Sequence, residues 1–247
     1  MSDDFRPIVF TDLDDTLFQS ERKVPAESRD GLRPVAGPND DIKAVMTRKQ
    51  QNLLRWLVQT TQLIPVTARS RREMDTLSIG LPADFRIASN GAVVINPDGT
   101  ADMDWHEMIV SEMSDYQDAL ADLHASLEEL ESAHELSMAA TLVGHDEMVV
   151  SLLFSALSGD GTHLEAVVPS FGHLEGWMVH HNGNTLALTP PPVSKKRAVA
   201  HVLSRMPDIG ERPVFGIGDS ISDLGFMAEC DFITAPRLSQ IGSSFRR

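Results

Sequence analysis

The chain has 247 residues, enough for one large domain or two small ones, and 42% of them are apolar. Its net charge of -15 excludes a general electrostatic attraction for nucleic acid or anionic lipid, and its single cysteine, Cys230, excludes an internal disulfide framework. No signal-like segment and no apolar run long enough to span a bilayer is present, so we expect a cytoplasmic protein that binds neither nucleic acid nor membrane, with its oligomeric state left open.

The first predicted element is a short buried strand, Ile8 to Phe10, which ends in the acidic segment Asp12 to Asp15. The polar residues 19 to 43 are rich in proline and glycine, which predicts a flap or long loop. Thr47 then suits the N-cap of a helix with apolar residues at helical spacing, and Leu63 to Val66 suits a second buried strand. Strand, helix and strand in this order predict a parallel sheet.

The middle of the chain has a different character. After a short helix around residues 70 to 77 and a strand ending at Ala88, residues 107 to 134 show a long amphipathic helical pattern. Residues 148 to 157 are strand-like, and Asn182-Gly183-Asn184 is typical of a hairpin turn. This mixture predicts a separate α+β domain.

We expect this domain to be an insertion over residues 93 to 190, within a core made of residues 1 to 92 and 191 to 247. Beyond it, Ser194 suits a helix N-cap, and Val214 to Ile217 suits another buried strand. The predicted fold class is α/β, with a doubly wound, Rossmann-like parallel sheet as the core and an inserted α+β domain.

Aspartates follow two of the predicted strands at the carboxyl edge, where doubly wound sheets bind ligands. Asp12 and Asp14 can converge on one cation, or act as nucleophile and general acid, although a bare Asp-x-Asp more often belongs to a solvated loop. Asp219 and Asp223 supply hard oxygen ligands that suit Mg²⁺, and they equally suit an acidic N-cap after a glycine turn.

Two other polar residues are predicted at the same edge. Thr67 directly follows a strand, so its hydroxyl and the nearby N–H groups can bind phosphate oxygens, although alone it better suits a helix cap. Lys195 begins a helix, where the helix dipole disfavours a cation, so an anionic partner would help explain its position. The alternative is that Lys195 is an ordinary surface lysine. His180 and His181 point to opposite faces of a strand, so we expect no zinc site there.

Four segments, in chain order and each at the end of a predicted element, together resemble the motifs of the haloacid dehalogenase superfamily. They are Val9 to Leu17, Pro65 to Arg69, Ser194 to Lys196, and Gly218 to Asp223. The insertion lies between the second and third motifs, where the type 2 cap of this superfamily sits. Its length and hairpin look most like the sucrose-phosphatase and trehalose-phosphatase branch.

The resemblance implies a Mg²⁺-dependent phosphate monoester hydrolase that acts through an aspartyl-phosphate intermediate. It implies that Asp12 is the nucleophile and that Asp14 is the general acid and base. Mg²⁺ is expected to bind Asp12, the backbone carbonyl of Asp14, and Asp219, with Asp223 as a ligand or as a support. Asp15 departs from the motif, because many relatives have glycine at that position.

The remaining site residues are expected to bind the substrate, a sugar phosphate or a similar small phosphorylated metabolite. Thr67 and Lys195 would bind the phosphoryl group, and Arg69, Asn90 and His181 would contact the leaving group, although turn and hairpin chemistry explains each of the last three as well. A sugar phosphomutase, which shares the cap class and the first motif, is an alternative. A regulatory phospho-acceptor domain is a more distant one.

Overall fold

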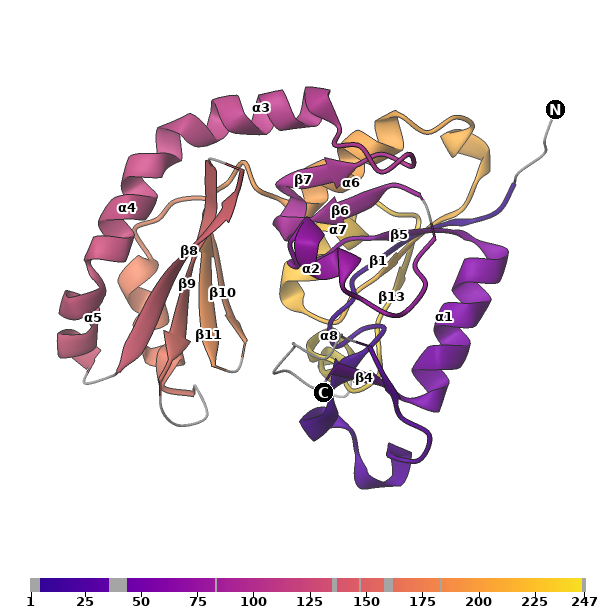
Figure 1. The fold of residues 1–247 in the computed structure, drawn as a ribbon, viewed down its shortest axis with the longest axis horizontal. Helices are drawn as coiled ribbons and strands as arrows, with labels where there is room; N and C mark the ends of the chain where they lie inside the picture. Colours follow the sequence, from indigo (N-terminus) through magenta and orange to yellow (C-terminus); the bar gives the residue numbers. More distant parts are fainter. Residues whose placement is uncertain are drawn as a thin grey trace. The chain divides into compact units, whose positions relative to one another are not determined.

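The computed structural model describes residues 5–35, 44–82, 84–134, 137–146, 148–157, 162–182 and 184–245. The chain forms two compact units, Met1–Trp105 with Ser194–Arg247, and His106–Val193 (Figure 1). Within the described ranges, no helix is both long enough and apolar enough to cross a membrane.

A four-stranded parallel sheet is the centre of the first unit, with the strand order β13-β12-β1-β5. Its strands are β1 (Ile8–Thr11), β5 (Gln62–Pro65), β12 (Val214–Ile217) and β13 (Phe232–Thr234). The chain adds β5 on one side of β1 and then adds β12 and β13 on the other, so the winding direction reverses at β1. The carboxyl end of β1 is therefore a topological switch point, the usual ligand position in such sheets. The predicted doubly wound parallel core is confirmed.

Side-chain caps start several helices of this unit. The Thr47 hydroxyl accepts a hydrogen bond from the Gln50 N–H while the Gln50 side chain accepts one from the Thr47 N–H, so the predicted N-cap is confirmed. Ser194 is the N-cap of α6, also as predicted. The α-helices of the unit are α1 (Arg48–Thr60), α2 (Arg71–Asp75), α6 (Lys195–Ser204), α7 (Leu224–Met227) and α8 (Gln240–Ser244), and α3 (Met103–Met113) begins in it.

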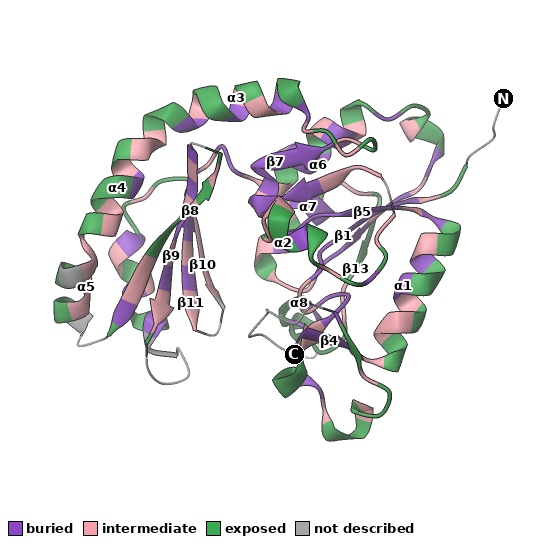
Figure 2. Cartoon of the chain, in the orientation of Figure 1, coloured by how far each residue is buried: buried purple, intermediate pink, exposed green. Residues whose placement is uncertain are grey.

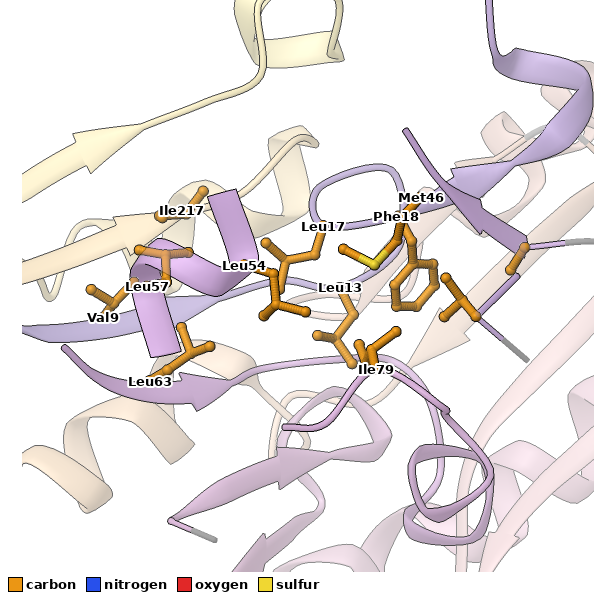
Figure 3. Close-up of a cluster of buried hydrophobic side chains, with 12 residues drawn as sticks. Val9, Leu13, Leu17, Phe18, Met46, Leu54, Leu57, Leu63, Ile79 and Ile217 are labelled. Atoms are coloured by element: carbon orange, nitrogen blue, oxygen red, sulfur yellow. The ribbon is translucent and has the colours of Figure 1, made fainter. Parts of the chain in front are cut away.

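One buried apolar cluster holds the loop that follows β1 (Figure 3). Leu13, inside the acidic segment Asp12 to Asp15, and Leu17 and Phe18, just after it, are all 0% exposed and anchor the loop. Burial of one such side chain stabilises a fold by about 1.5–3 kcal/mol. The other members of the cluster are Val9, Val35, Ala44, Met46, Leu54, Leu57, Leu63, Ile79 and Ile217. The position of Asp12 and Asp14 is thus fixed by apolar packing on either side.

Residues 19 to 43 were predicted to be a flap or long loop, and the described part of this segment is more regular than that. β2 (Gln19–Ser20) and β3 (Arg33–Pro34) pair antiparallel with the two sides of β4 (Ala44–Met46). The 3-10 turns η1 (Glu21–Lys23) and η2 (Ala26–Ser28) connect the strands. The prediction of a loop was wrong for β2 and β3 because a partner strand organises residues that lack strand periodicity of their own; residues 36–43 lie outside the described ranges.

A small hairpin completes the first unit. β6 (Arg86–Ala88) pairs antiparallel with β7 (Val93–Ile95), and the turn η3 (Ser89–Gly91) lies between them. A parallel bridge between Val66 and Ile87 joins the hairpin to the end of the β5 segment. The turn is therefore held beside the loop that carries Thr67. η6 (Ile209–Glu211) and η7 (Ile221–Asp223) are the remaining 3-10 turns of this unit.

The second unit contains an antiparallel sheet with the strand order β10-β11-β9-β8. Burial alternates along β9, as expected when one face of a strand packs on a core (Figure 2). The predicted hairpin is present, although Gly183 of its turn lies outside the described residues. The elements are α3 (shared with the first unit), η4 (Ser114–Tyr116), α4 (Gln117–Ala125), α5 (Leu127–His134), β8 (Met138–His145), β9 (Met148–Ala156), η5 (Thr162–Phe171), β10 (Met178–Asn182) and β11 (Thr185–Thr189).

The long helical pattern over residues 107 to 134 is not one helix. It is divided into α3, the 3-10 turn η4, α4 and α5. Ser126 ends α4, with its N–H bonded to the Asp122 carbonyl oxygen, before α5 begins at Leu127. Apolar periodicity continues through such breaks because each short helix presents an apolar face, which is why the pattern alone did not reveal them.

Candidate active site

Lys195 contacts two aspartates that lie far apart in the sequence, at the carboxyl edge of the sheet. Its ammonium Nζ lies 2.7 Å from Asp12 Oδ1 and 2.8 Å from Asp223 Oδ1, and its side chain is only 10% exposed. The Asp12 and Asp223 side chains are 7% and 0% exposed. Lys195 therefore has the anionic partners that a cation at a helix N-terminus requires.

Asp223 is positioned by a dense set of donors. Its second oxygen, Oδ2, accepts hydrogen bonds from the Ser220 hydroxyl at 2.9 Å and from the backbone N–H groups of Asp219 and Ser220 at 3.1 Å each. Gly218 allows this approach, because a Cβ at that position would lie 2.5 Å from the Asp223 Cβ. Asp223 thus has one oxygen fixed by the loop and the other directed at Lys195.

Asp12, Asp219 and Asp223 form a group of carboxylates whose nearest oxygen atoms lie within 4.8 Å of one another. Burial, together with the negative charge of Asp223 and Asp14, raises the pKa of Asp12 to about 7 despite the attraction of Lys195. Burial and the charges of Asp12, Asp223 and Asp15 raise the pKa of Asp219 to about 8. One ammonium does not balance the three carboxylates.

The pKa values of Lys195 and Asp223 shift in the directions that favour their charged forms. Burial acts to lower the pKa of Lys195, but Asp12 and Asp223 outweigh it and raise that pKa above the ordinary value. Burial acts to raise the pKa of Asp223, and the ammonium of Lys195 with the Ser220 hydrogen bonds lowers it overall. Lys195 and Asp223 therefore form the fixed ion pair of the site, and Asp12 and Asp219 are the carboxyl groups whose ionised forms lack a sufficient balancing cation.

The ligand atoms and the charge of this cluster indicate which ion it could bind. The candidate ligand atoms are carboxylate oxygens, which are the ligands a hard divalent cation prefers. The raised pKa values of Asp12 and Asp219 mark the place where added positive charge would be most stabilising. The cluster therefore fits a bound Mg²⁺.

Asp14 does not lie in this cluster of carboxylates but pairs with an arginine. Arg69 Nε donates to Asp14 Oδ2 at 2.7 Å, and Arg69 Nη2 donates to Asp14 Oδ1 at 2.9 Å. The Arg69 guanidinium also lies 5.2 Å from the centre of the Phe18 ring, which supports its orientation. The structure thus brings Asp14 and Arg69 together, a contact that the sequence motifs do not predict.

Asp15 occupies a position where glycine is frequent in the resembling family, and its backbone explains that preference. Its φ is 58°, in the left-handed region that glycine adopts without strain. Aspartate tolerates this region better than most residues, and the Asp15 side chain pairs with Lys23 Nζ at 2.5 Å. Aspartate is therefore compatible with the left-handed backbone of this turn.

Thr67 and Asn90 are brought together by backbone hydrogen bonds. The Asn90 N–H donates to the Thr67 carbonyl at 3.0 Å, and the Ser89 N–H donates to the Arg69 carbonyl at 2.8 Å. The Thr67 hydroxyl oxygen accepts from the Arg69 N–H at 3.1 Å, which leaves the hydroxyl hydrogen able to point to a ligand. Thr67, Arg69 and Asn90 therefore line one loop region.

Gly91 was not predicted as a functional residue, yet it controls how closely α6 approaches. Its φ is 99°, and a Cβ at this position would lie 2.3 Å from the Ser194 carbonyl oxygen and 2.9 Å from the Lys195 nitrogen. Only glycine satisfies both the backbone angle and this contact. The Asn90-Gly91 pair signalled a turn in the sequence, but its packing partner lies about a hundred residues away.

A second unpredicted cluster holds the other end of α6. Asp102 is 4% exposed; its Oδ2 lies 2.8 Å from His201 Nε2 and also contacts Arg205. The backbone N–H of Trp105 donates to Asp102 Oδ1 at 3.2 Å, and the Trp105 ring lies 4.8 Å from the His201 ring, centre to centre. Buried carboxylates thus hold α6 at both ends.

His181, which was predicted to contact substrate, lies on β10 in the second unit. It is half-buried, and its backbone pairs with Leu186 of β11. Asp12, Asp14, Thr67, Arg69, Asn90, Lys195, Asp219 and Asp223 all belong to the first unit. Their assignment as site residues and that of His181 continue below as proposals.

Comparisons with known proteins bear on the fold. No family model and no curated protein matches the chain. A solved structure described as a trehalose-6-phosphate phosphatase related protein is similar, with a TM-score of 0.50 and 17% identity over 92% of this chain and 85% of that chain. At this identity the likeness shows a shared fold. The chain therefore shares the fold of that structure.

Two further structures are similar at slightly lower scores. A haloacid dehalogenase-like hydrolase from Bacteroides thetaiotaomicron has a TM-score of 0.48 and 16% identity, over 98% of this chain and 99% of that chain. A haloacid dehalogenase-like hydrolase from B. subtilis also has a TM-score of 0.48 and 16% identity, over 92% of this chain and 94% of that chain.

Proposed function

We propose that the protein is a Mg²⁺-dependent phosphate monoester hydrolase that forms an aspartyl phosphate on Asp12. The observation that carries this proposal is the ammonium of Lys195 between Asp12 and Asp223, at the switch point of the sheet. A solvated loop or a helix cap requires no buried ammonium. A phosphate dianion requires one, because it must approach a carboxylate of the same charge.

In the first step, a carboxylate oxygen of Asp12 attacks phosphorus in line and the P–O bond to the leaving alcohol breaks. Asp14 donates its proton to the leaving oxygen. Both Asp14 oxygens accept hydrogen bonds from Arg69 in this structure, so in this proposal at least one of these contacts is exchanged for the leaving oxygen. Arg69 is then available to bind the substrate.

In the second step, Asp14 takes a proton from water, and the resulting hydroxide oxygen attacks the phosphorus of the aspartyl phosphate. The bond between phosphorus and the Asp12 oxygen breaks, which releases inorganic phosphate and restores both carboxyl groups to their starting states. Water attack on this intermediate is what separates the proposed hydrolase from a phosphomutase, in which a sugar hydroxyl accepts the phosphoryl group instead.

Three groups stabilise the charge of the phosphoryl group. Lys195 supplies an ammonium fixed by Asp223, and the Thr67 hydroxyl can donate to a phosphate oxygen. Bound Mg²⁺ would supply Lewis-acid stabilisation of the same charge, held by Asp12, Asp219, the backbone carbonyl of Asp14, and Asp223 as a ligand or a support. The hydrogen bonds that hold Lys195 and Asp223 support a preorganised site in this proposal.

We further propose that the unit His106–Val193 acts as the cap that selects the leaving group, and that sugar phosphates or similar small phosphorylated metabolites are the substrates. In this proposal Asp12, Asp219, Thr67 and Lys195 are occupied by the phosphoryl group and the metal, so discrimination among alcohols needs other residues. His181 on β10, and Arg69 and Asn90 in the core, carry the donors and acceptors that read hydroxyl groups. The similar trehalose-6-phosphate phosphatase related protein supports a sugar phosphate as the first substrate to test.

The test is phosphate release from a panel of sugar phosphates, nucleotides and p-nitrophenyl phosphate in excess Mg²⁺. Asp12→Asn keeps the shape of the side chain but removes its nucleophilic charge, so turnover should be lost while circular dichroism stays unchanged. Asp122→Asn, the same substitution on the exposed surface of α4, is the matched control. Activity of Asp12→Asn near that of the control would overturn the proposal, and isomerisation of a sugar phosphate without net phosphate release would favour the mutase.

A further inference from the structure

We propose that His106, His145 and Asp146 form a binding site for Zn²⁺ or a chemically similar transition-metal ion in the second unit. His145 and Asp146 are neighbours in the sequence, and His106 lies far from both. The fold brings one ligand atom of each residue to within 4.8 Å of the others. This site shares no residue with the proposed catalytic cluster and does not depend on the proposed function.

Three elements supply the ligands. His106 lies in the first turns of α3, whose buried residues Ile109 and Met113 fix the helix in the core. His145 is the last residue of β8, and Asp146 follows it in the turn to β9. The His106 and His145 rings lie 6.1 Å apart, centre to centre, at an interplanar angle of 85°. Two imidazoles from different elements therefore approach the same point.

The distances suit a metal ion after a small adjustment. Two ligands that bind one Zn²⁺ at about 2.0–2.1 Å each lie at most about 4.2 Å apart. The ligand atoms of this cluster lie within 4.8 Å of one another, which is slightly more than that limit. Rotation of one side chain moves its ligand atom by more than this difference. The His145 Nε2 atom already lies 3.5 Å from Asp146 Oδ2.

The chemistry of the ligand set selects the kind of ion. Imidazole nitrogens suit Zn²⁺, Co²⁺ and Ni²⁺, whereas Mg²⁺ is bound through oxygen. The catalytic cluster of Asp12, Asp219 and Asp223 offers only oxygen from its side chains, and the cluster at His106 offers two nitrogens and one carboxylate. The two sites should therefore divide Mg²⁺ and Zn²⁺ between them.

Two features hold the hairpin end in place for this role. His145 pairs with Met148 across the turn, and Asp146 has a φ of 52°, the left-handed geometry of a tight hairpin turn. The Gln117 side chain also bonds the next residue of β9 in both directions: its Nε2 donates to the Val149 carbonyl and its Oε1 accepts from the Val149 N–H, each at 3.0 Å. The start of α4 is thereby tied to the hairpin close to His145.

An ion can reach the site from solvent. The Asp146 side chain is 70% exposed and the His145 side chain is 19% exposed, so the carboxylate forms the outer edge and the imidazole the inner one. Three protein ligands leave a fourth position to water or to an added ligand, as in open zinc sites. A bound ion would cross-link α3 to the β8–β9 hairpin and stabilise the second unit.

The experiment titrates the full-length protein with Co²⁺ in excess Mg²⁺, which keeps the oxygen-only cluster occupied, and then displaces Co²⁺ with Zn²⁺. We expect one Co²⁺ per chain, with the visible absorption of a low-coordinate site containing imidazole, and a rise in melting temperature on addition of Zn²⁺. The His106→Ala and Asp146→Asn variants should each weaken Zn²⁺ binding by tenfold or more. His124→Ala, a histidine of α4 outside the cluster, is the matched control.

Asp146→Asn keeps the proposal testable if a histidine variant fails to fold, because asparagine tolerates the left-handed region and the side chain is exposed. Absence of Co²⁺ binding in excess Mg²⁺ would overturn the proposal and leave the two rings as an edge-to-face packing pair. Binding that is equal in His106→Ala, Asp146→Asn and His124→Ala would also overturn it, since the ion would then lie elsewhere.

Discussion

Gly91 packs against Ser194 so closely that no side chain fits between them. A Cβ on Gly91 would lie 2.3 Å from the Ser194 carbonyl oxygen, which belongs to the N-cap of the helix that carries Lys195. The turn after β6 therefore sets the position of the ammonium group at the candidate active site.

Gly91→Ala should consequently lower both stability and activity. The substitution strains the left-handed backbone, by about 1–3 kcal/mol, and pushes the start of α6 away from Asp12. Gly80→Ala separates the two effects, because Gly80 has a φ of 65° but open space around its Cβ position. Denaturant unfolding and steady-state kinetics should show a stability loss in both variants and a lower kcat in Gly91→Ala alone. Equal kcat values in the two variants would contradict this role.

Lys195→Met should reduce kcat about 10²–10³-fold, since it removes a preorganised cation from the developing phosphoryl charge. Lys196→Met is the matched control, because the Lys196 side chain is 57% exposed and makes only a 3.5 Å pair with Glu229. The control should change the free energy of unfolding by less than about 0.5 kcal/mol and leave kcat unchanged. Similar kcat values for the two variants would show that Lys195 is merely structural.

Removal of the metal should abolish phosphate release, and Asp219→Ala should raise the Mg²⁺ concentration needed for half-maximal activity by tenfold or more. The carboxyl group of Asp219 is half-buried beside Asp12, and a bound cation would stabilise its ionised form, whose pKa is raised to about 8 without one. Thermal denaturation should show a smaller change, because the variant also relieves that repulsion. Full activity of the wild type in excess EDTA would rule out the metal role, and Asp122→Ala controls for the loss of a surface carboxylate.

Arg69→Ala and His181→Ala should lower kcat/KM for the best sugar phosphate much more than for p-nitrophenyl phosphate. The reason is that both residues are proposed to contact the leaving group, which differs between the two substrates. Arg72→Ala, an exposed arginine of α2, is the control for loss of charge. Equal losses on both substrates would instead place Arg69 and His181 in general structural roles.

Asp102 should make stability depend on pH in the acid range. Burial acts to raise its pKa, but the hydrogen bonds from His201 and the Trp105 N–H, with the charges of His201 and Arg205, lower it overall. A folded-state pKa below the unfolded value, about 3.9, means that the contribution is fully present above that pH. It is then lost as the pH falls through the lower folded-state value.

The measurement is the urea midpoint between about pH 6 and pH 2 for wild type and Asp102→Asn. The variant should be less stable near pH 6 and should lose less stability on acidification. Asp104→Asn, the same change on the exposed first turn of α3, should follow the wild-type curve. Parallel curves for Asp102→Asn and wild type would exclude the pairing as a source of stability.

Features encoded by neighbouring residues could be predicted from the sequence. The caps at Thr47 and Ser194 and the strand before Asp12 each depend on a few adjacent side chains, and each is confirmed. The parallel sheet followed from the order of strand and helix. The breaks in the 107–134 helical pattern did not, because short helices in series keep the same apolar periodicity.

Contacts between distant segments could not be predicted. The Asp14–Arg69 pair joins residues 55 apart, and the Asp102–His201 contact joins residues 99 apart. The residues around each aspartate do not indicate which distant side chain will pair with it in the folded protein. The histidines illustrate the limit most clearly, because adjacency drew attention to His180 and His181, whereas the fold brings together His106 and His145.

The 183-residue separation between Asp12 and Lys195 has a consequence for synthesis of the chain. At about 5–20 residues per second, roughly 10–40 s pass between translation of Asp12 and translation of its ammonium partner. β1 can pair with β5 during that time, but β12 has not yet been made. The nascent chain therefore carries Asp12 without its Lys195 partner until residue 195 has been translated, so the Asp12–Lys195 pair forms only after β1 and β5 are both available.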